Sequence, residues 1–406
     1  MIQAERLGGA RRTGAAGWWR ARWRAAASVF ALLGPGLLAM AGDNDAGGLL
    51  SYAATGDRFG AVWFSLLLLP LGVCAVVVQD MALRVGTVTG RGLAELIRTR
   101  FSRGWAWLAG IDLAVQNALT LVTEFIGMGM GLAHFGVPLD AGVPLSCGLV
   151  LLLVLVPRYR AAERAAVGLA VASLLFLPLA AGVLGRQGAA VWAARPAPHL
   201  GLFLVAAVGN ALAPWMLFFQ TQASAGGRRS IAAGRVDLAA GASVQVLVAV
   251  AVVVLGAAGA VGGGARGLGA LGGDLFAIGI FDAGLVAALT VSLSTAWAVA
   301  ETFGGRARPE AGLREAPAFY AAYTAGVVAA AASVLWPGLA PLHIAVLVQA
   351  ASAILLPPLV ALLIALANDP QVMPEGRNGR WHNVAAGAVL VLFVAACFWL
   401  LVGPRV

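Results

Sequence analysis

The sequence predicts an all-α membrane protein that crosses the bilayer about eleven times. Hydrophobic residues make up 61% of the 406 residues, and charged residues only 11%. An average soluble domain has about 25% charged residues. A chain with so few charges cannot cover its folded surface with polar side chains, so we expect lipid to surround most of that surface. The composition therefore argues against a soluble enzyme.

Apolar segments recur along the whole chain at the length that a membrane requires. A helix needs about 20 apolar residues to cross a hydrocarbon core of about 30 Å. The residues ahead of the first segment, 1–26, are basic and aromatic, and we expect them to lie at the cytoplasmic surface, followed by one transmembrane domain over 27–403. The predicted spans are 27–54, 60–83, 104–134, 139–157, 163–184, 200–224, 236–260, 275–303, 316–336, 340–366 and 383–403.

The basic residues predict the orientation of the chain in the cell (inner) membrane. All 27 are arginines, and 22 of them precede the first span or follow an even-numbered one. Short cytoplasmic loops are enriched in basic residues, so we expect a cytoplasmic N-terminus and, after an odd number of crossings, an extracytoplasmic C-terminus. The net charge of +9 then indicates contact with anionic lipid and not with nucleic acid. Nothing in the sequence calls for an obligatory protein partner.

Two of the predicted spans are interrupted in their middles. The first contains Gly42-Asp43-Asn44-Asp45-Ala46-Gly47-Gly48, and the sixth contains Gly209-Asn210-Ala211-Leu212-Ala213-Pro214-Trp215. Proline removes a backbone donor and forces the preceding residue out of helical geometry, while glycines and carboxylates disfavour a continuous buried helix. We therefore expect both helices to be broken near the middle of the membrane.

The spacing of the two breaks predicts an inverted repeat. Five helices separate Asp45 from Ala213, and an odd number of crossings inverts the orientation of the second copy. Broken helices at corresponding positions of two halves are typical of transporters that bind their substrate at the midplane. The expected architecture is a five-plus-five repeat with an eleventh helix.

Several motifs, taken in order, resemble the Nramp family of metal-ion transporters. The resemblance implies a LeuT-type fold with helices 1 and 6 broken, and the transport of divalent metals. The similar stretches are Gly34-Pro35-Gly36, Asp45-Ala46-Gly47-Gly48, Thr87 to Leu96, Glu124-Phe125-Ile126-Gly127, Asn368-Asp369 with Val372-Met373, and Arg380-Trp381.

The sequence departs from the family pattern at the site itself. The family's helix 1 Asn falls on Gly48, and its helix 6 Met-Pro-His falls on Ala213-Pro214-Trp215. A further helix 6 His falls on Gln220, and a helix 3 Asp on Leu121. The missing Met is shared with the Nramp-related magnesium transporters, which this chain resembles more than it resembles the iron and manganese branch.

Asp45 is the first candidate ligand for a metal ion. An unpaired carboxylate in the middle of a membrane costs several kcal/mol unless a cation compensates it. The alternative is that Asp45 caps the second half-helix, and both roles are compatible. Asp43 and Asn44 add oxygens close by, provided that the chain is unwound there. Each is either a direct ligand or a partner that holds a ligand in place. Free carbonyls at Gly42, Leu212 and Ala213 are further candidate ligands, since a broken helix exposes the partial negative charge of its C-terminal end.

Four other polar residues within predicted spans are candidates for the site or for the transport path. Gln349 falls where the family has a pore-lining Gln, although a hydrogen bond between helices explains it equally well. Glu124 is a possible gate, a proton relay or the partner of an arginine, and Asn117 lies two turns before it. Gln220 is a possible lining of the inward path or a packing residue.

These observations predict a secondary transporter or uniporter of divalent cations that works by alternating access and needs no cofactor. An all-oxygen site without a thioether favours hard ions, with Mg²⁺ first and Mn²⁺ next. The alternatives are an ion-coupled carrier of a small organic solute on the same fold and, more remotely, a membrane-embedded enzyme or sensor. The four histidines are scattered and neither an HExxH nor a GxSxG motif occurs, so we expect no enzymatic activity.

Overall fold

The computed structural model describes residues 34–155, 159–227, 230–260, 268–302, 315–338 and 340–402. Within those ranges every regular element is a helix. The predicted N-terminal segment 1–26 and the start of the first span lie outside the described residues.

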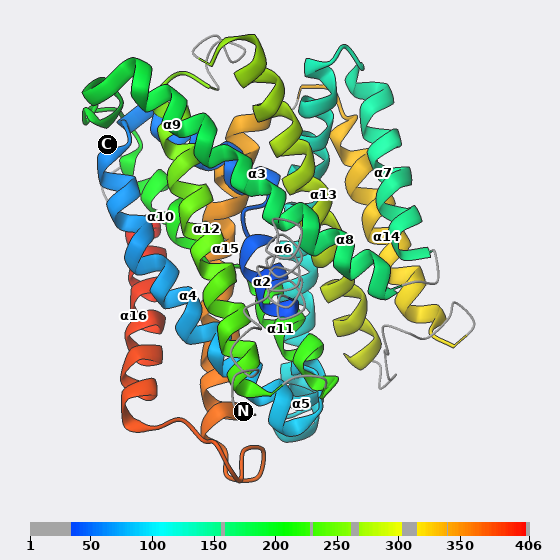
Figure 1. The fold of residues 1–406 in the computed structure, drawn as a ribbon. Helices are drawn as coiled ribbons and strands as arrows, with labels where there is room; N and C mark the ends of the chain where they lie inside the picture. The colour runs from blue at the N-terminus through cyan, green and yellow to red at the C-terminus, as the bar shows by residue number, and fades with distance from the viewer. Residues whose placement is uncertain are drawn as a thin grey trace, which may run out of the picture.

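The helices form one bundle, shown in Figure 1. Two of the predicted spans are each built from two half-helices, and the fifth span is built from α8, η1 and α9. The bounds are α2 (Pro35–Ala41), α3 (Ala46–Phe59), α4 (Val62–Thr89), α5 (Leu93–Arg100), α6 (Arg103–His134), α7 (Leu139–Leu155), α8 (Tyr159–Ala172), η1 (Ser173–Leu175), α9 (Phe176–Gln187), η2 (Gly188–Trp192), α10 (Leu200–Asn210), α11 (Pro214–Ala225), α12 (Ile231–Ala257), α13 (Gly269–Thr302), α14 (Pro317–Val334), α15 (Pro341–Asn368) and α16 (Arg380–Val402).

The helices follow the predicted spans closely. Nine helical segments of the described residues are long and apolar enough to cross a membrane, two of them, Ala166–Trp192 and Leu200–Ala225, being composed of consecutive helices, and α7 is a shorter apolar helix. The largest differences, six residues, occur at the end of α4 and at the start of α13. The hydropathy pattern misses the end of α4 because Arg84 is charged. The guanidinium of Arg84 forms an ion pair at 2.9 Å with Asp80, one turn earlier, and the helix continues past both residues.

Both predicted breaks are present. α2 ends at Ala41, and α3 begins at Ala46 after the extended residue Asp45. α10 ends at Asn210, and α11 begins at Pro214, which occupies its first turn, where a missing N–H costs nothing. The breaks lie five spans apart, and α16 follows the second half. The predicted arrangement of two broken helices and an eleventh helix is confirmed.

Packing places the breaks inside the bundle. α13 packs along α6, α10 along α15, and α12 contacts α2, α3 and α4. In Figure 1, α4 and α16 lie at one edge and α7 and α14 at the other, while α2 and α11 lie between them. The half-helices are therefore surrounded by full-length helices, which shield their exposed backbone groups from lipid.

A carboxylate on α12 holds the start of α2. Asp237, which is 1% exposed, accepts hydrogen bonds from the backbone N–H groups of Gly34 at 2.9 Å, Gly36 at 2.8 Å and Leu37 at 3.1 Å. These are donors that the first turn of a helix leaves unpaired. A Cβ at Gly36 would come within 2.9 Å of the Leu238 amide nitrogen, so this contact requires glycine. The first half-helix is thus attached to α12 at its N-terminal end.

Charged groups gather at the end of the bundle that carries α5. Asp80 accepts from Arg84 and from Arg235 of α12, the latter at 2.7 Å. Arg84 also donates to the carbonyl of Gly376 at 2.9 Å, in the loop between α15 and α16. Figure 1 shows this loop at the same end as α5. These pairs connect α4, α12 and the loop at the arginine-rich end.

Candidate cation-binding site

The two breaks bring four helix ends into the interior. The last turns of α2 and α10 carry carbonyls, and the first turns of α3 and α11 carry N–H groups, that have no partner within their own helix. In lipid each such group must be paired by the protein or by a ligand. The side chains around the breaks show how that requirement is met.

Asp45 caps the N-terminus of α3. Its Oδ1 accepts a hydrogen bond from the backbone N–H of Gly48 and a second from Nε2 of Gln349, on α15, at 3.2 Å. The side chain is 2% exposed. The structure therefore joins Asp45 and Gln349 and shows that Asp45 is a helix cap. Oδ1 accepts both of these hydrogen bonds. The carboxylate that caps α3 therefore still places a negative charge inside the break.

Asp43 and Asn44 are held by a residue that the sequence did not single out. Gln245 of α12 donates from Nε2 to Oδ2 of Asp43 at 2.5 Å and to the carbonyl of Ala211 at 3.1 Å. Nδ2 of Asn44 donates to the backbone carbonyl of Gln245 at 3.0 Å. Gln245 therefore bridges the two breaks. Its only sequence signal was an isolated amide within the apolar seventh span.

Three amide side chains at the breaks leave their oxygens without a donor. Within the described residues, Oδ1 of Asn44, Oδ1 of Asn210 and Oε1 of Gln245 are buried and accept no hydrogen bond. The NH₂ group of each of these side chains donates a hydrogen bond. The NH₂ group of Asn210 donates to the carbonyl of Gly48 at 3.1 Å. A buried acceptor without a donor costs about 1–3 kcal/mol. A cation would satisfy such oxygens.

Glu124 lies against the first break as a second cap of α3. Its Oε2 accepts from the backbone N–H of Ala46 at 2.8 Å, and Oγ1 of Thr123 lies 3.3 Å from Oε1. Glu124 is 0% exposed. The carboxylate reaches the break from α6, so the first turn of α3 is held by its own Asp45 and by a neighbouring helix. Its described contacts are with these backbone and hydroxyl groups and not with an arginine.

The hydrogen bonds of Asn117 and Gln220 point away from the breaks. Nδ2 of Asn117 donates to the Val291 carbonyl and to Oγ of Ser294 at 3.1 Å, which fastens α6 to α13. Nε2 of Gln220 donates at 2.9 Å to Ser224, one turn later on α11. The structure therefore does not bring these two candidates together with Asp45.

The backbone positions Gly42, Leu212 and Ala213 lie where the half-helices end. Gly42 continues the hydrogen bonding of α2 through its N–H, which donates to Leu38 at 2.9 Å. The N–H of Ala213 donates to the sulfur of Met216 at 3.2 Å, so a thioether at the second break serves as a backbone acceptor. All three positions are buried.

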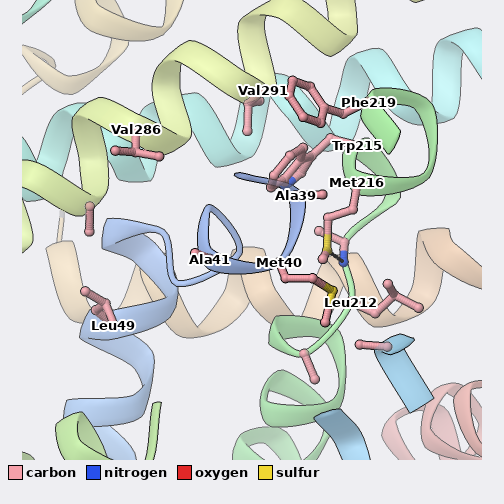
Figure 2. Close-up of a cluster of buried hydrophobic side chains, with 14 of the residues drawn as sticks. Ala39, Met40, Ala41, Leu49, Leu212, Trp215, Met216, Phe219, Val286 and Val291 are labelled. Carbon is pink, nitrogen blue, oxygen red and sulfur yellow. Dashed lines mark hydrogen bonds between the residues drawn. The ribbon is translucent and has the colours of Figure 1, made fainter. Parts of the chain in front are cut away.

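An apolar cluster encloses the breaks. Figure 2 shows Met40, Leu212, Trp215, Met216 and Phe219 within one cluster of buried hydrophobic side chains. The rings of Trp215 and Phe219 are 6.0 Å apart, edge to face. Water is excluded on this side, so charges at Asp43 and Asp45 interact more strongly with a cation than they would in water.

The donor set differs from that of a resident metal centre. Within the described part of the chain, no three His, Cys, Asp or Glu side chains gather in a geometry that could hold a metal ion. The side-chain oxygens at the breaks come from carboxylates and amides. Such a set suits weak, reversible binding of a hard cation more than a tight structural or catalytic site.

Comparisons with known proteins show the family and the fold of the chain. A family model described as "Natural resistance-associated macrophage protein-like", Nramp, matches residues 36–403. The divalent metal cation transporter MntH of Levilactobacillus brevis is 33% identical over 144 residues, 35% of this chain and 29% of that protein. The matched stretch thus spans less than a third of that relative.

Two solved structures share the fold. The manganese transporter of Eremococcus coleocola, in complex with an aromatic bis-isothiourea substituted compound, has a TM-score of 0.71 and 19% identity, covering 97% of this chain and 88% of that chain. Mhp1, a nucleobase-cation-symport-1 family transporter, has a TM-score of 0.59 and 13% identity, covering 90% and 92%. At these identities the likeness shows the fold, and the predicted LeuT-type fold is confirmed.

We expect Glu124→Ala to destabilise the protein, because the amide of Ala46 loses its acceptor in a buried position. The cost is about 1–3 kcal/mol. Glu124→Gln keeps an oxygen that accepts the same hydrogen bond and should recover most of the loss. Thermal unfolding in detergent measures both, with Asp57→Ala at the exposed end of α3 as the matched control. Equal melting of Glu124→Ala and the wild type would contradict the capping role.

Proposed function

Because the chain belongs to the Nramp family, whose model matches residues 36–403, we propose that it carries divalent metal cations across the membrane through its two helix breaks. The match confirms the resemblance that the sequence motifs indicated. The site described above supplies the physical support for the proposed activity.

The observation that carries the proposal is the oxygen-rich interior of the breaks. Asp43 and Asp45 bring two carboxylates, each 2% exposed, and three amide oxygens near them have no donor among the described residues. Two uncompensated carboxylates and three unpaired acceptors in the middle of a membrane are unfavourable. A divalent cation removes both costs at once, which favours its binding at the breaks.

We propose that the site accepts Mn²⁺ and Mg²⁺ and discriminates against the softer Cd²⁺. Oxygen ligands suit hard cations, whereas a thioether ligand favours softer ones. The sulfur of Met216 already accepts a hydrogen bond from the Ala213 N–H. This supports a set of cation ligands made only of oxygens. The shared fold with the manganese transporter of Eremococcus coleocola supports Mn²⁺ as a substrate. The sequence favoured Mg²⁺, which dehydrates reluctantly and fits a site that keeps some of its water.

The breaks give little support to the alternative of a small organic solute. Trp215 lies against the first break, with its ring 3.3 Å from the point where a Cβ at Gly42 would lie. Its ring packs on Phe219. These large side chains fill the space beside the break that an organic molecule would need.

We further propose uniport, or coupling by a route different from the one that the family resemblance implies. The positions that the resemblance assigns to a proton relay hold Trp215, Gln220 and Leu121, none of which titrates near neutral pH. Glu124 is the remaining ionisable candidate, and the structure engages its carboxylate in capping α3. A group committed to a structural hydrogen bond is poorly placed to shuttle protons.

The orientation proposed is N-terminus in the cytoplasm and C-terminus outside, in the cell membrane. Its support is the concentration of arginines at the end of the bundle that carries α5, where Arg84, Arg100 and Arg235 all form ion pairs. Arginines at this end also suit contact with anionic lipid headgroups.

Asp45→Asn should abolish transport of Mn²⁺ into proteoliposomes while the protein keeps its thermal stability. Asparagine caps a helix as well as aspartate does, but it carries no charge. Asp43→Asn should reduce transport less, since its carboxylate already accepts from Gln245. Asp57→Asn, on the exposed end of the same helix, is the control. Normal uptake by Asp45→Asn would show that the cation binds elsewhere.

Ala213→Met should shift selectivity toward softer cations. A polarizable sulfur at the second break favours Cd²⁺ over Mg²⁺, and we expect the ratio of their affinities to change on the order of tenfold. Isothermal titration of the detergent-purified protein with each ion measures that ratio. Ala223→Met, further along α11, controls for the added bulk. A ratio that stays at the wild-type value would exclude residue 213 from the binding site.

Proteoliposomes that contain a pH-sensitive dye test the proposed lack of proton coupling. With an inward gradient of Mn²⁺ and the membrane potential clamped, we expect cation uptake without acidification of the interior. Acidification that follows uptake in the wild type and disappears in Glu124→Gln would overturn the proposal. Protein-free liposomes and Asp45→Asn liposomes give the background for passive proton leak.

A further inference from the structure

The side chain of Asn210 occupies the place where a side chain of residue 48 would begin. Residue 48 is a glycine, and a Cβ built on it would overlap Oδ1 of Asn210 and come within 2.9 Å of Cγ of the same side chain. Asn210 is the last residue of α10, and Gly48 lies in the first turn of α3. An amide from the second break thus fills a position in the first.

Two oxygens converge on this position. The point where a Cβ of residue 48 would lie is 2.8 Å from Oδ1 of Asp45 and closer still to Oδ1 of Asn210. Oxygens that bind one octahedral cation at about 2.1 Å lie about 3 Å apart, so two oxygens that approach a common point suit a shared ion. The carboxylate and the amide belong to different breaks.

The hydrogen bond of the Asn210 amide fixes which of its atoms faces the break. Its Nδ2 donates to the carbonyl of Gly48 at 3.1 Å, so the NH₂ group is committed to the backbone of α3. The oxygen is left without a donor among the described residues, although the side chain is 1% exposed. An amide held in this way presents an acceptor and no proton toward Asp45.

We propose that Asn210 is a ligand of the transported cation and takes the place of a side-chain ligand at residue 48. The inference rests on the proposed function and adds a specificity-determining residue to it. The neutral amide oxygen of Asn210 adds one hard ligand without adding a third negative charge to those of Asp43 and Asp45. Asp45 lies at the first break and Asn210 at the second, so an ion bound to both side chains connects the two breaks.

The test is a swap of the amide between the two positions, read by isothermal titration of purified protein with Mn²⁺. Asn210→Ala should weaken binding by about 10- to 100-fold, as expected for loss of a group that serves a metal site. Gly48→Asn alone should weaken binding too, because the new side chain collides with Asn210. The double variant Gly48→Asn with Asn210→Ala removes the overlap with Asn210 and restores an amide. The new Cβ still lies 2.8 Å from Oδ1 of Asp45, so that carboxylate must shift slightly, and the affinity should return part of the way toward that of the wild type.

Asn117→Ala is the matched control, since Asn117 is equally buried but its amide bonds to α13. It should keep the wild-type affinity. Asn210→Asp keeps the shape and one oxygen but loses the Nδ2 donor to the Gly48 carbonyl. Because the added negative charge attracts a cation more strongly than an amide oxygen does, we expect it to bind Mn²⁺ at least as tightly as the wild type, which provides a second test if Asn210→Ala does not fold.

The outcomes separate this inference from the proposed function. A wild type that binds no divalent cation overturns both. A wild type that binds Mn²⁺, together with unchanged affinity in Asn210→Ala or weakened affinity in Asn210→Asp, overturns only the role of Asn210. Failure of the double variant to bind better than Gly48→Asn alone also counts against the shared position.

Discussion

The structure depends on the pairing of backbone groups that two broken helices expose in the middle of a membrane. An unpaired N–H or C=O costs several kcal/mol in lipid, and the breaks create several of each. Carboxylates from full-length helices and from the break itself pair the donors: Asp237 at the start of α2, and Glu124 with Asp45 at the start of α3. Gln245 donates a hydrogen bond to the carbonyl of Ala211 at the second break.

The same pairing explains why the breaks suit a cation. Donors at the starts of α2 and α3 are matched by carboxylates, whereas three amide oxygens at the breaks are left without a donor among the described residues. The imbalance favours positive charge at the point where the halves of the inverted repeat meet. The enclosing apolar side chains exclude water there and strengthen that preference. The polar groups that are costly to bury at the breaks are therefore the groups that we propose bind the cation.

The sequence predicted the fold and the breaks because both rest on local patterns. Apolar length marks a span, and Pro214 or a carboxylate within such a span indicates that the helix is interrupted there. The bridge that Gln245 forms was not predicted, and neither was the role that we propose for Asn210, because one amide in an apolar helix looks the same whether it faces a neighbour or a break. Which way such a side chain points is decided by packing between distant segments. Glu124 was recognised as buried, but its use as a cap of α3 depends on how α6 lies against the break.

Anomalous diffraction from crystals grown with Mn²⁺ tests the central claim most directly, because it locates the ion without a change in sequence. The account predicts an anomalous peak between the two breaks, within coordination distance of Asp45 and of the oxygen of Asn210, and weakened when Mg²⁺ is added in excess. A peak elsewhere in the bundle, or no peak at concentrations that saturate transport, would contradict the account.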